Sequence, residues 1–277
     1  MKIVSICPSN TELAVCLGLA DQLVGLDDFS DWPEEIKHLP RLGPDLSIRM
    51  DDLEKCEPDL VLASLSVPGM EKNIEELERR NLPYMVFDPQ SFEDLNEDLM
   101  RLGERTGCLD KAQEKTKVLR SIVKQFEIKS LELSSKPSVY FEWWPKPIFT
   151  PGGTNWLTEM SRLAGGENIF SQTEIPSIQT DWEDILTKDP DYFFLVWVGV
   201  KESKMKIEHV QKRTRSSELS ALRNGRVIML QEALFCRPSP RLYEGLANLA
   251  AILHPDHFKD QISLIRNSSI YSGRKIL

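Results

Sequence analysis

The sequence predicts an α/β protein of two similar lobes, each a small parallel sheet with flanking helices, bridged by one long helix. Three observations support this fold class. Short apolar runs alternate with amphipathic segments through both halves of the 277 residues, a pattern typical of parallel sheets covered by helices. A stretch near the middle has helical spacing and contains neither Gly nor Pro. One segment of the first half is echoed in the second half.

The first half supplies the elements of one lobe. Its continuous apolar runs indicate buried parallel strands, because such strands are covered on both faces. Helices are expected between them, and Ser9 or Asn10 can cap the first. The expected strands are residues 3–6, 23–26, 60–64 and 84–87, and the expected helices are residues 10–19, 51–56, 70–80 and 92–106.

Residues 109–133 are expected to form the bridging helix. Val118, Ile122 and Phe126 recur close to helical spacing along it. A helix of about 25 residues would span roughly 37 Å, enough to run along both lobes. The polar run that ends at Pro137 marks a boundary. We therefore expect a first lobe at residues 1–107, an interlobe helix at 108–135 and a second lobe at 136–277.

The second half repeats the order of the first. Residues 51–59 align with residues 183–191 without gaps, at a shift of 132 residues from 51 to 183. In both segments a Pro-Asp pair ends a short helix and begins an apolar strand. Two related lobes are the simplest explanation. The further elements expected here are strands at 139–142, 192–198 and 226–230 and helices at 156–164 and 241–253.

Charge and composition exclude some classes of function. The net charge is −9 and the pI is about 5.1, whereas nucleic-acid binding relies on clustered Lys and Arg. No run approaches the roughly 18 apolar residues that span a bilayer. The first strand begins directly after Met1 and Lys2, with no signal segment ahead of Cys7. A cytoplasmic location is expected from the sequence as written, and an extracytoplasmic, membrane-associated one if an export segment was omitted.

Aromatic residues gather in the loops that follow the predicted strands. Ligands of parallel α/β sheets bind at the carboxyl ends of the strands, so these loops are expected to form a cleft between the lobes. Rings suit a broad, partly apolar ligand because they supply contact area at little entropic cost. Arg237 is expected to add a polar contact, and Arg241 could bind a charged ligand group. The expected ring-bearing site residues are Phe29, Trp32, Trp143, Trp144, Phe149, Trp197 and Phe235.

Catalytic patterns are poor in this sequence. The Gly pairs at 152–153 and 165–166 lack the Lys-Ser/Thr ending of a phosphate-binding loop, and no Gly-x-Ser-x-Gly elbow occurs. The five cysteines have no metal-ligand spacing and are expected to be reduced, structural thiols. Cys7 and Cys236 are the only plausible nucleophiles. A binding protein without catalysis, cofactor or protein-bound metal is therefore expected.

A series of short segments resembles the helical-backbone substrate-binding proteins of ABC importers, and among them the vitamin B12 (cobalamin)-binding proteins. The resemblance covers about residues 2–255. It implies two lobes bridged by one long helix and a ligand bound in the interlobe cleft with little hinge motion. The segments that carry it are residues 8–13, 30–33, 58–61, 149–152, 165–170 and 237–241.

The resemblance also assigns roles to single residues. Phe29 and Phe149 fall on aromatic positions that line the cleft in cobalamin-binding members, and both keep a ring. Ser64 and Ser177 fall on two further positions of the ligand site where Trp is expected. The pocket therefore departs from the best-known pattern, and Trp143, Trp144 and Trp197 could compensate from neighbouring positions.

The family further implies docking on an ABC permease through one acidic residue per lobe. The matching residues are Asp51 and Glu183, which begin the two copies of the internal repeat. The implied ligand is cobalamin or another corrinoid, and the chain is expected to be a monomer. An iron siderophore or haem stays open as the ligand, and so does a cytosolic corrinoid-binding relative or enzyme. A charged chelate would require Arg237 or Arg241, whereas a neutral, amide-fringed corrinoid would depend more on the rings.

Overall fold

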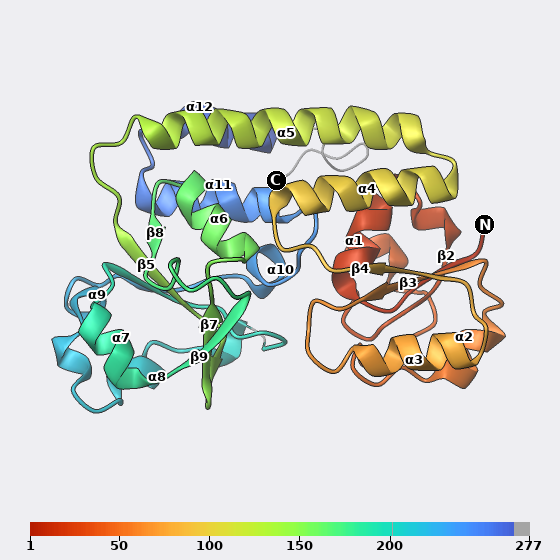
Figure 1. The fold of residues 1–277 in the computed structure, drawn as a ribbon, viewed down its shortest axis with the longest axis horizontal. Coiled ribbons are helices and arrows are strands. Elements are labelled where there is room, and N and C mark those ends of the chain that lie inside the picture. Colours follow the sequence, from red (N-terminus) through yellow and green to blue (C-terminus); the bar gives the residue numbers. More distant parts are fainter. Residues whose placement is uncertain (201, 269–277) are drawn as a thin grey trace.

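The computed structural model describes residues 1–200 and 202–268, and it has the two-lobed α/β architecture that the sequence predicts (Figure 1). The sheet of the first lobe has the strand order β2-β1-β3-β4, and every neighbouring pair is parallel. Its strands are β1 (Ile3–Ser5), β2 (Leu23–Leu26), β3 (Leu60–Ser64) and β4 (Tyr84–Phe87). Its helices are α1 (Pro8–Cys16), α2 (Met50–Lys55), α3 (Glu71–Arg79) and α4 (Phe92–Thr106).

The second lobe has a parallel sheet of the same size, in the order β11-β10-β5-β8. All residues of β1 and β3 in the first lobe are buried, as are four of the five residues of β5, so the apolar runs are central strands covered on both faces. The strands of this sheet are β5 (Ser138–Glu142), β8 (Glu167–Asn168), β10 (Tyr192–Leu195) and β11 (Val227–Met229). Its helices are α6 (Trp156–Leu163), α7 (Trp182–Lys188), α8 (Glu208–Gln211), α9 (Ser220–Arg223), α10 (Glu232–Phe235), α11 (Leu242–Leu253) and α12 (Lys259–Asn267).

The internal repeat is confirmed in atomic detail. Glu57 and Asp189, which are 132 positions apart, are both non-glycine residues with positive φ, at 49° and 41°. Two residues later, each Pro-Asp carboxylate accepts a backbone N–H at the start of the first strand of its own sheet. Asp59 accepts from Lys2 at 2.6 Å, and Asp191 accepts from Ser138 at 2.8 Å. In both lobes, the Asp of the repeated Pro-Asp pair therefore binds the end of a short helix segment to the start of the adjacent parallel strand.

A third, antiparallel sheet in the second lobe was not predicted. It consists of β6 (Trp144–Pro145), β7 (Ile148–Pro151) and β9 (Ser177–Thr180), in that order. Its strands have two to four residues, two of them end in a proline, and a third proline lies in the turn between β6 and β7, so they carry little alternating pattern. The sheet projects from the end of β5, toward the first lobe in Figure 1.

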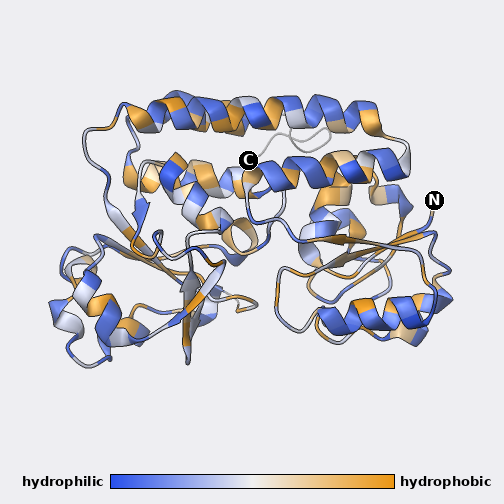
Figure 2. Cartoon of the chain, in the orientation of Figure 1, coloured by the Kyte–Doolittle hydropathy of each residue, from blue (hydrophilic) through white to orange (hydrophobic). Residues whose placement is uncertain are grey.

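The long helix α5 (Leu109–Leu131) runs over both lobes, as expected (Figure 1). Its 23 residues give a length of about 35 Å. It packs against α4 of the first lobe and against α6 and α12 of the second. Figure 2 shows orange, apolar turns mixed with blue, polar ones along this helix, which has one side buried and the other open to solvent.

The largest apolar core belongs to both lobes at once. It includes Leu13 of α1, Phe126 of α5 and Trp156 of α6. The rings of Phe92 in α4 and Tyr243 in α11 meet edge to face, with centroids 4.9 Å apart. The lobes are therefore joined by buried side chains as well as by chain connections. The boundaries expected at 107/108 and 135/136 stay a prediction, because this core crosses both.

Candidate functional site

The loop of residues 27–33 is the first-lobe side of the expected cleft, and buried polar groups fix its shape. The Asp27 carboxylate accepts the Phe29 N–H at 2.7 Å and also binds the Ser30 hydroxyl. Ser30 in turn bonds to Thr11 of α1 at 2.7 Å. The Arg41 guanidinium donates to the carbonyl oxygens of Asp27 and Ser30, at 2.9 and 2.6 Å. This preformed loop holds Phe29 at the surface with 44% of the residue exposed.

Burial leaves the Asp27 carboxyl with an unusual proton affinity. Its removal from water raises the pKa from its ordinary value of 3.8 to about 6, although hydrogen bonds from Ser30 and Phe29 lower the pKa. Desolvation is therefore the larger effect at this position.

The small antiparallel sheet carries the residues expected on the second-lobe side of the cleft. Trp144 pairs with Phe149 across β6 and β7, and Phe149 pairs with Gln179 across β7 and β9. Directly paired residues project from the same face of an antiparallel sheet, so these three side chains form one row, which we call the aromatic row. Ser177, two residues before Gln179, is on the same face. The opposite face carries Ile148, which packs into the second apolar core.

The aromatic row is open to solvent. Trp144 is 42% exposed, Gln179 is exposed and Phe149 is half-buried. In Figure 1, β7 and β9 lie on the side of the second lobe that is nearer to the first lobe. The row therefore exposes two rings and an amide on the part of the second lobe that lies nearer to the first.

Other residues expected in the cleft lie deeper in the protein. Trp197 belongs to the second core, where its ring stacks on His209 with centroids 5.1 Å apart. Phe235 is almost fully buried, and its carbonyl oxygen accepts the indole N–H of Trp156 at 2.8 Å. Trp197 follows the end of β10 and Phe235 is the last residue of α10, and both side chains are buried. In this structure neither ring is available at the surface, contrary to the expectation from the sequence.

Ser64, Trp143 and Trp32 occupy intermediate places. Ser64 ends β3, is buried and bonds to Ser66 at 2.9 Å. Trp143 packs against Trp156, with ring centroids 5.6 Å apart, and its indole N–H has no hydrogen-bond partner among the residues that the structure describes. Trp32 is half-buried beneath the Arg241 guanidinium, whose carbon lies 5.0 Å from the ring centroid. All three residues are buried or half-buried.

Arg237 was expected to contact a ligand, but the structure places it in an ionic cluster between the lobes. It binds Asp31 at 2.7 Å, Glu232 at 3.0 Å and Glu12 at 3.3 Å. Glu12 also accepts from Arg241 at 3.1 Å. Nearby carboxylates raise the pKa of Arg237 further above its usual range, against the effect of burial. The two guanidinium groups are therefore engaged by carboxylates of the protein itself.

Glu12 was not anticipated from the sequence. It is 1% exposed and lies on α1, every residue of which is buried. Its partners are 225 to 229 positions away, so no local pattern announces them. The one sequence feature that could have indicated its role is the charge itself, because Glu12 is the only charged residue of α1.

A second buried carboxylate lies at the end of β5, next to the sheet that carries the aromatic row. Glu142, the last residue of β5, is fully buried and directly precedes Trp143 and Trp144. It binds Arg213 in bidentate fashion, at 2.6 and 2.7 Å, and accepts the indole N–H of Trp197 at 3.1 Å. The Trp143 carbonyl accepts the Val198 N–H at 3.1 Å. These bonds fix the strand ends from which the small sheet projects.

The two cysteines considered as nucleophiles are not activated. Burial raises the pKa of Cys7 to about 11. Burial also raises the pKa of Cys236 well above its usual range, and its thiol donates to the Val196 carbonyl. A nucleophilic cysteine needs a lowered pKa and access to solvent, and neither residue meets both conditions.

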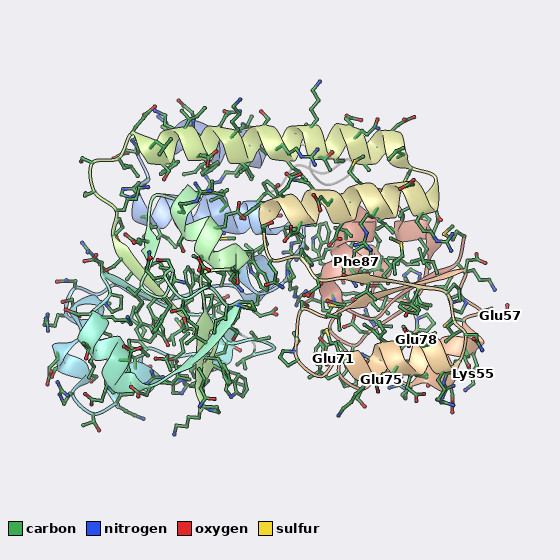
Figure 3. The ribbon with its side chains drawn as sticks, in the orientation of Figure 1. Lys55, Glu57, Glu71, Glu75, Glu78 and Phe87 are labelled. Atoms are coloured by element: carbon green, nitrogen blue, oxygen red, sulfur yellow. The ribbon has the colours of Figure 1, made fainter. Side chains whose placement is uncertain are left out.

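The two acidic residues matched to permease docking are exposed and similarly placed. Asp51 and Glu183 stand in the first turns of α2 and α7, on the side of the molecule opposite α5 (Figure 1). Each is paired with an arginine of its own lobe, Arg80 at 2.7 Å and Arg215 at 2.6 Å. Figure 3 shows further charged side chains, among them Lys55, Glu71 and Glu75, at the same end of the first lobe.

Three surface hollows lie away from the aromatic row. Hollows of about 520, 500 and 450 Å³ are lined by residues around Arg162, Arg49 and Lys206, and none of the three includes Phe29 or Phe149. Across residues 1–200 and 202–268, no three His, Cys, Asp or Glu side chains gather as they would around a metal ion. No helix in these same ranges has the length and apolarity to cross a membrane.

Two lobes with parallel sheets, bridged by one long helix, define a binding-protein fold of the kind that serves ABC importers. The chain belongs to the periplasmic binding protein family, whose sequence model matches residues 3–234.

Individual relatives agree with this family. An uncharacterized ABC transporter substrate-binding lipoprotein of Bacillus subtilis, YvrC, is 32% identical over 94% of this chain and 82% of its own length. A vitamin B12-binding protein of Vibrio parahaemolyticus is 26% identical over 93% of this chain and 89% of its own. The structure of S. aureus IsdE complexed with heme has a TM-score of 0.81 at 19% identity, and the match covers 91% of this chain and 98% of that one. This last likeness shows the fold alone.

These relatives do not support the cytoplasmic location expected from the sequence. The Bacillus subtilis relative is named as a lipoprotein.

Proposed function

We propose that this chain is the substrate-binding component of an ABC-type importer and that it captures a corrinoid, such as cobalamin, between its two lobes. It acts by binding, without chemistry of its own, outside the cytoplasmic membrane. The family supports the general role, and relatives named as vitamin B12-binding proteins, matched over most of their length, support the ligand class.

One observation favours a corrinoid over haem or a siderophore that carries carboxylates. Haem and carboxylate siderophores carry negative charges, which a binding site meets with free guanidinium or ammonium groups. The two arginines that the sequence offers for this task, Arg237 and Arg241, are held by Glu12, Asp31 and Glu232. The cluster contains more carboxylates than guanidinium groups. A neutral ligand fringed with amides does not compete for them.

The aromatic row and Phe29 provide the contacts that such a ligand requires. A corrin ring is broad and flat, and it can lie against Trp144 and Phe149 with little loss of side-chain entropy. Gln179 stands in the same row with both a donor and an acceptor, which suits a peripheral amide. Phe29 faces the ligand from the other lobe, on a loop that needs no rearrangement to present it.

Calorimetric titration with cyanocobalamin, haemin and ferrichrome tests the ligand class. We expect one-to-one binding with a Kd of micromolar or lower for cyanocobalamin alone. Phe149→Ala and Trp144→Ala should each weaken binding by tenfold or more, since loss of a ring contact costs about 1.5–3 kcal/mol. Val118→Ala on α5, an exposed apolar residue remote from the row, is the matched control. Binding of haemin or ferrichrome instead would refute the corrinoid assignment and leave the family role in place.

We further propose that Asp51 and Glu183 dock the protein on its permease. Both are exposed, lie in equivalent turns of the repeat and stand on one side of the molecule. Uptake of labelled cobalamin into vesicles that carry the permease should fall when both are replaced by Ala, while cobalamin binding in solution stays unchanged. Undiminished uptake by the double variant would contradict this docking role.

A further inference from the structure

The carboxylate of Glu12 lies at the junction of the two lobes. It belongs to α1 of the first lobe, yet the donors that contact it come from residues 237–241 of the second lobe. Arg237 and Arg241 approach its Oε1 atom at 3.3 and 3.1 Å, and the Ser239 hydroxyl binds Oε2. The sequence of α1 contains no basic residue.

An ionised carboxylate that is 1% exposed is strongly unfavourable unless its charge and hydrogen bonds are matched. Here the match comes from the second lobe. A change in the relative position of the lobes would therefore separate Glu12 from its partners while it stays buried in the first lobe. The present orientation is favoured by the desolvation cost of every orientation that breaks these bonds.

The same two guanidinium groups hold the loop that carries Phe29. Arg237 binds Asp31 of this loop at 2.7 Å, and Arg241 lies over the ring of Trp32. The ionic cluster thus ties both α1 and the 27–33 loop to the second lobe.

We propose that Glu12 is a positioning residue that fixes the orientation of the two lobes and thereby the width of the ligand cleft. The part of this proposal that concerns the ligand rests on the proposed function, whereas the part that concerns lobe orientation does not. Asp31 is the second interlobe carboxylate of the same cluster and acts in the same direction.

The cluster supplies its own matched control. Glu232 binds Arg237 at 3.0 Å, but both residues belong to the second lobe. Glu232→Gln removes a carboxylate from Arg237 and leaves each interlobe bond in place. Glu12→Gln keeps the size of the side chain and removes the interlobe charge. A general effect of weakening the cluster would appear in both variants, whereas an effect on lobe orientation would appear only in Glu12→Gln.

Lobe orientation can be measured by pulsed electron resonance between spin labels on the exposed residues Glu75 of α3 and Gln211 of α8. Labels attached through a keto amino acid spare the five native cysteines. In Glu12→Gln we expect the distance distribution to shift or broaden by about 2 Å or more, the scale of a domain rearrangement. Cyanocobalamin affinity should fall at least fivefold. In Glu232→Gln both quantities should match those of the unmodified protein.

A distance distribution for Glu12→Gln that superimposes on the unmodified one would overturn the proposal. If Glu12→Gln does not fold, Asp31→Asn takes its place, because Asp31 is exposed and its replacement leaves no buried carboxylate without a partner. If the distances change but no variant binds cyanocobalamin, the corrinoid assignment fails while the role of Glu12 in lobe orientation holds.

Discussion

Replacement of Arg213 by Met isolates the energetic role of the carboxylate behind the aromatic row. Arg213 makes two bonds to Glu142, at 2.6 and 2.7 Å, and its guanidinium lies 4.9 Å from the ring centroid of Trp182. Methionine keeps an apolar chain over that ring and removes the charge. Glu142, which is fully buried, then retains only the indole N–H of Trp197 among these partners.

The expected magnitude follows from the burial of the pair. Removing one partner of a buried ion pair costs about 3–5 kcal/mol, because the other charge stays desolvated. Glu142→Gln should cost less, about 1–2 kcal/mol, since Arg213 keeps some exposure to water and a neutral acceptor. In the double variant the two costs should not add, because no buried charge is left. We expect a coupling free energy of at least about 1.5 kcal/mol.

Urea unfolding at pH 7, followed by far-UV circular dichroism, measures the four free energies of this cycle. The slope with urea should be equal in all four proteins, so that midpoints report stability. A cost below about 1 kcal/mol for Arg213→Met, or strict additivity in the double variant, would refute the view that Glu142 depends on this partner.

Three further predictions concern buried positions. Asp27→Asn should remove a pH dependence: burial raises the folded pKa of Asp27 to about 6, so its contribution to stability is largest at low pH and is lost as pH rises through 6. Between pH 4 and 7 the free energy of unfolding of the variant should rise by about 2–3 kcal/mol relative to that of the unmodified protein. A difference between the two free energies, measured by urea unfolding, that stays constant over this pH range would contradict the prediction. Phe126→Ala should cost about 3–5 kcal/mol, since its ring stacks on Phe258 in the core that both lobes share; Ile128→Ala, at an exposed position, should change the free energy of unfolding by less than about 0.5 kcal/mol. Gly245→Ala should lower the thermal midpoint by several degrees, because the new Cβ would lie 2.2 Å from the Leu234 carbonyl oxygen; an unchanged midpoint would mean that α10 moves freely.

The fold was predictable because its central strands are short apolar runs and its lobes share a repeat. Residues 60–64 and 84–87 were predicted as strands, and the structure has β3 and β4 there. The bridging helix was expected at 109–133 and ends at Leu131. The sheet of β6, β7 and β9 escaped prediction because β9 pairs with a strand some 30 residues earlier and because prolines obscure the alternation. Pairing at that distance leaves no local trace in the sequence.

The site was predictable in part. A ring placed just after a strand marks the correct edge of a sheet, and this located Phe29 and Trp144 at the surface. It does not reveal whether the chain then turns outward or inward, which is why Trp197 and Phe235 were misplaced. Gln179 and Glu12 were missed for different reasons. Gln179 depends on the register of an unexpected sheet, and Glu12 on partners at the other end of the chain.

The apolar core that joins Phe92 to Tyr243 bears on how such a chain can evolve. The repeat suggests that one ancestral unit was duplicated, and duplicated units often serve afterwards as exchangeable modules. Here each half lacks part of its own interior without the other. A recombinant that joined the first lobe to a foreign second lobe would inherit mismatched rings at the junction. Change in specificity is therefore expected to arise by substitution within the cleft, and both halves of the chain are expected to be inherited together.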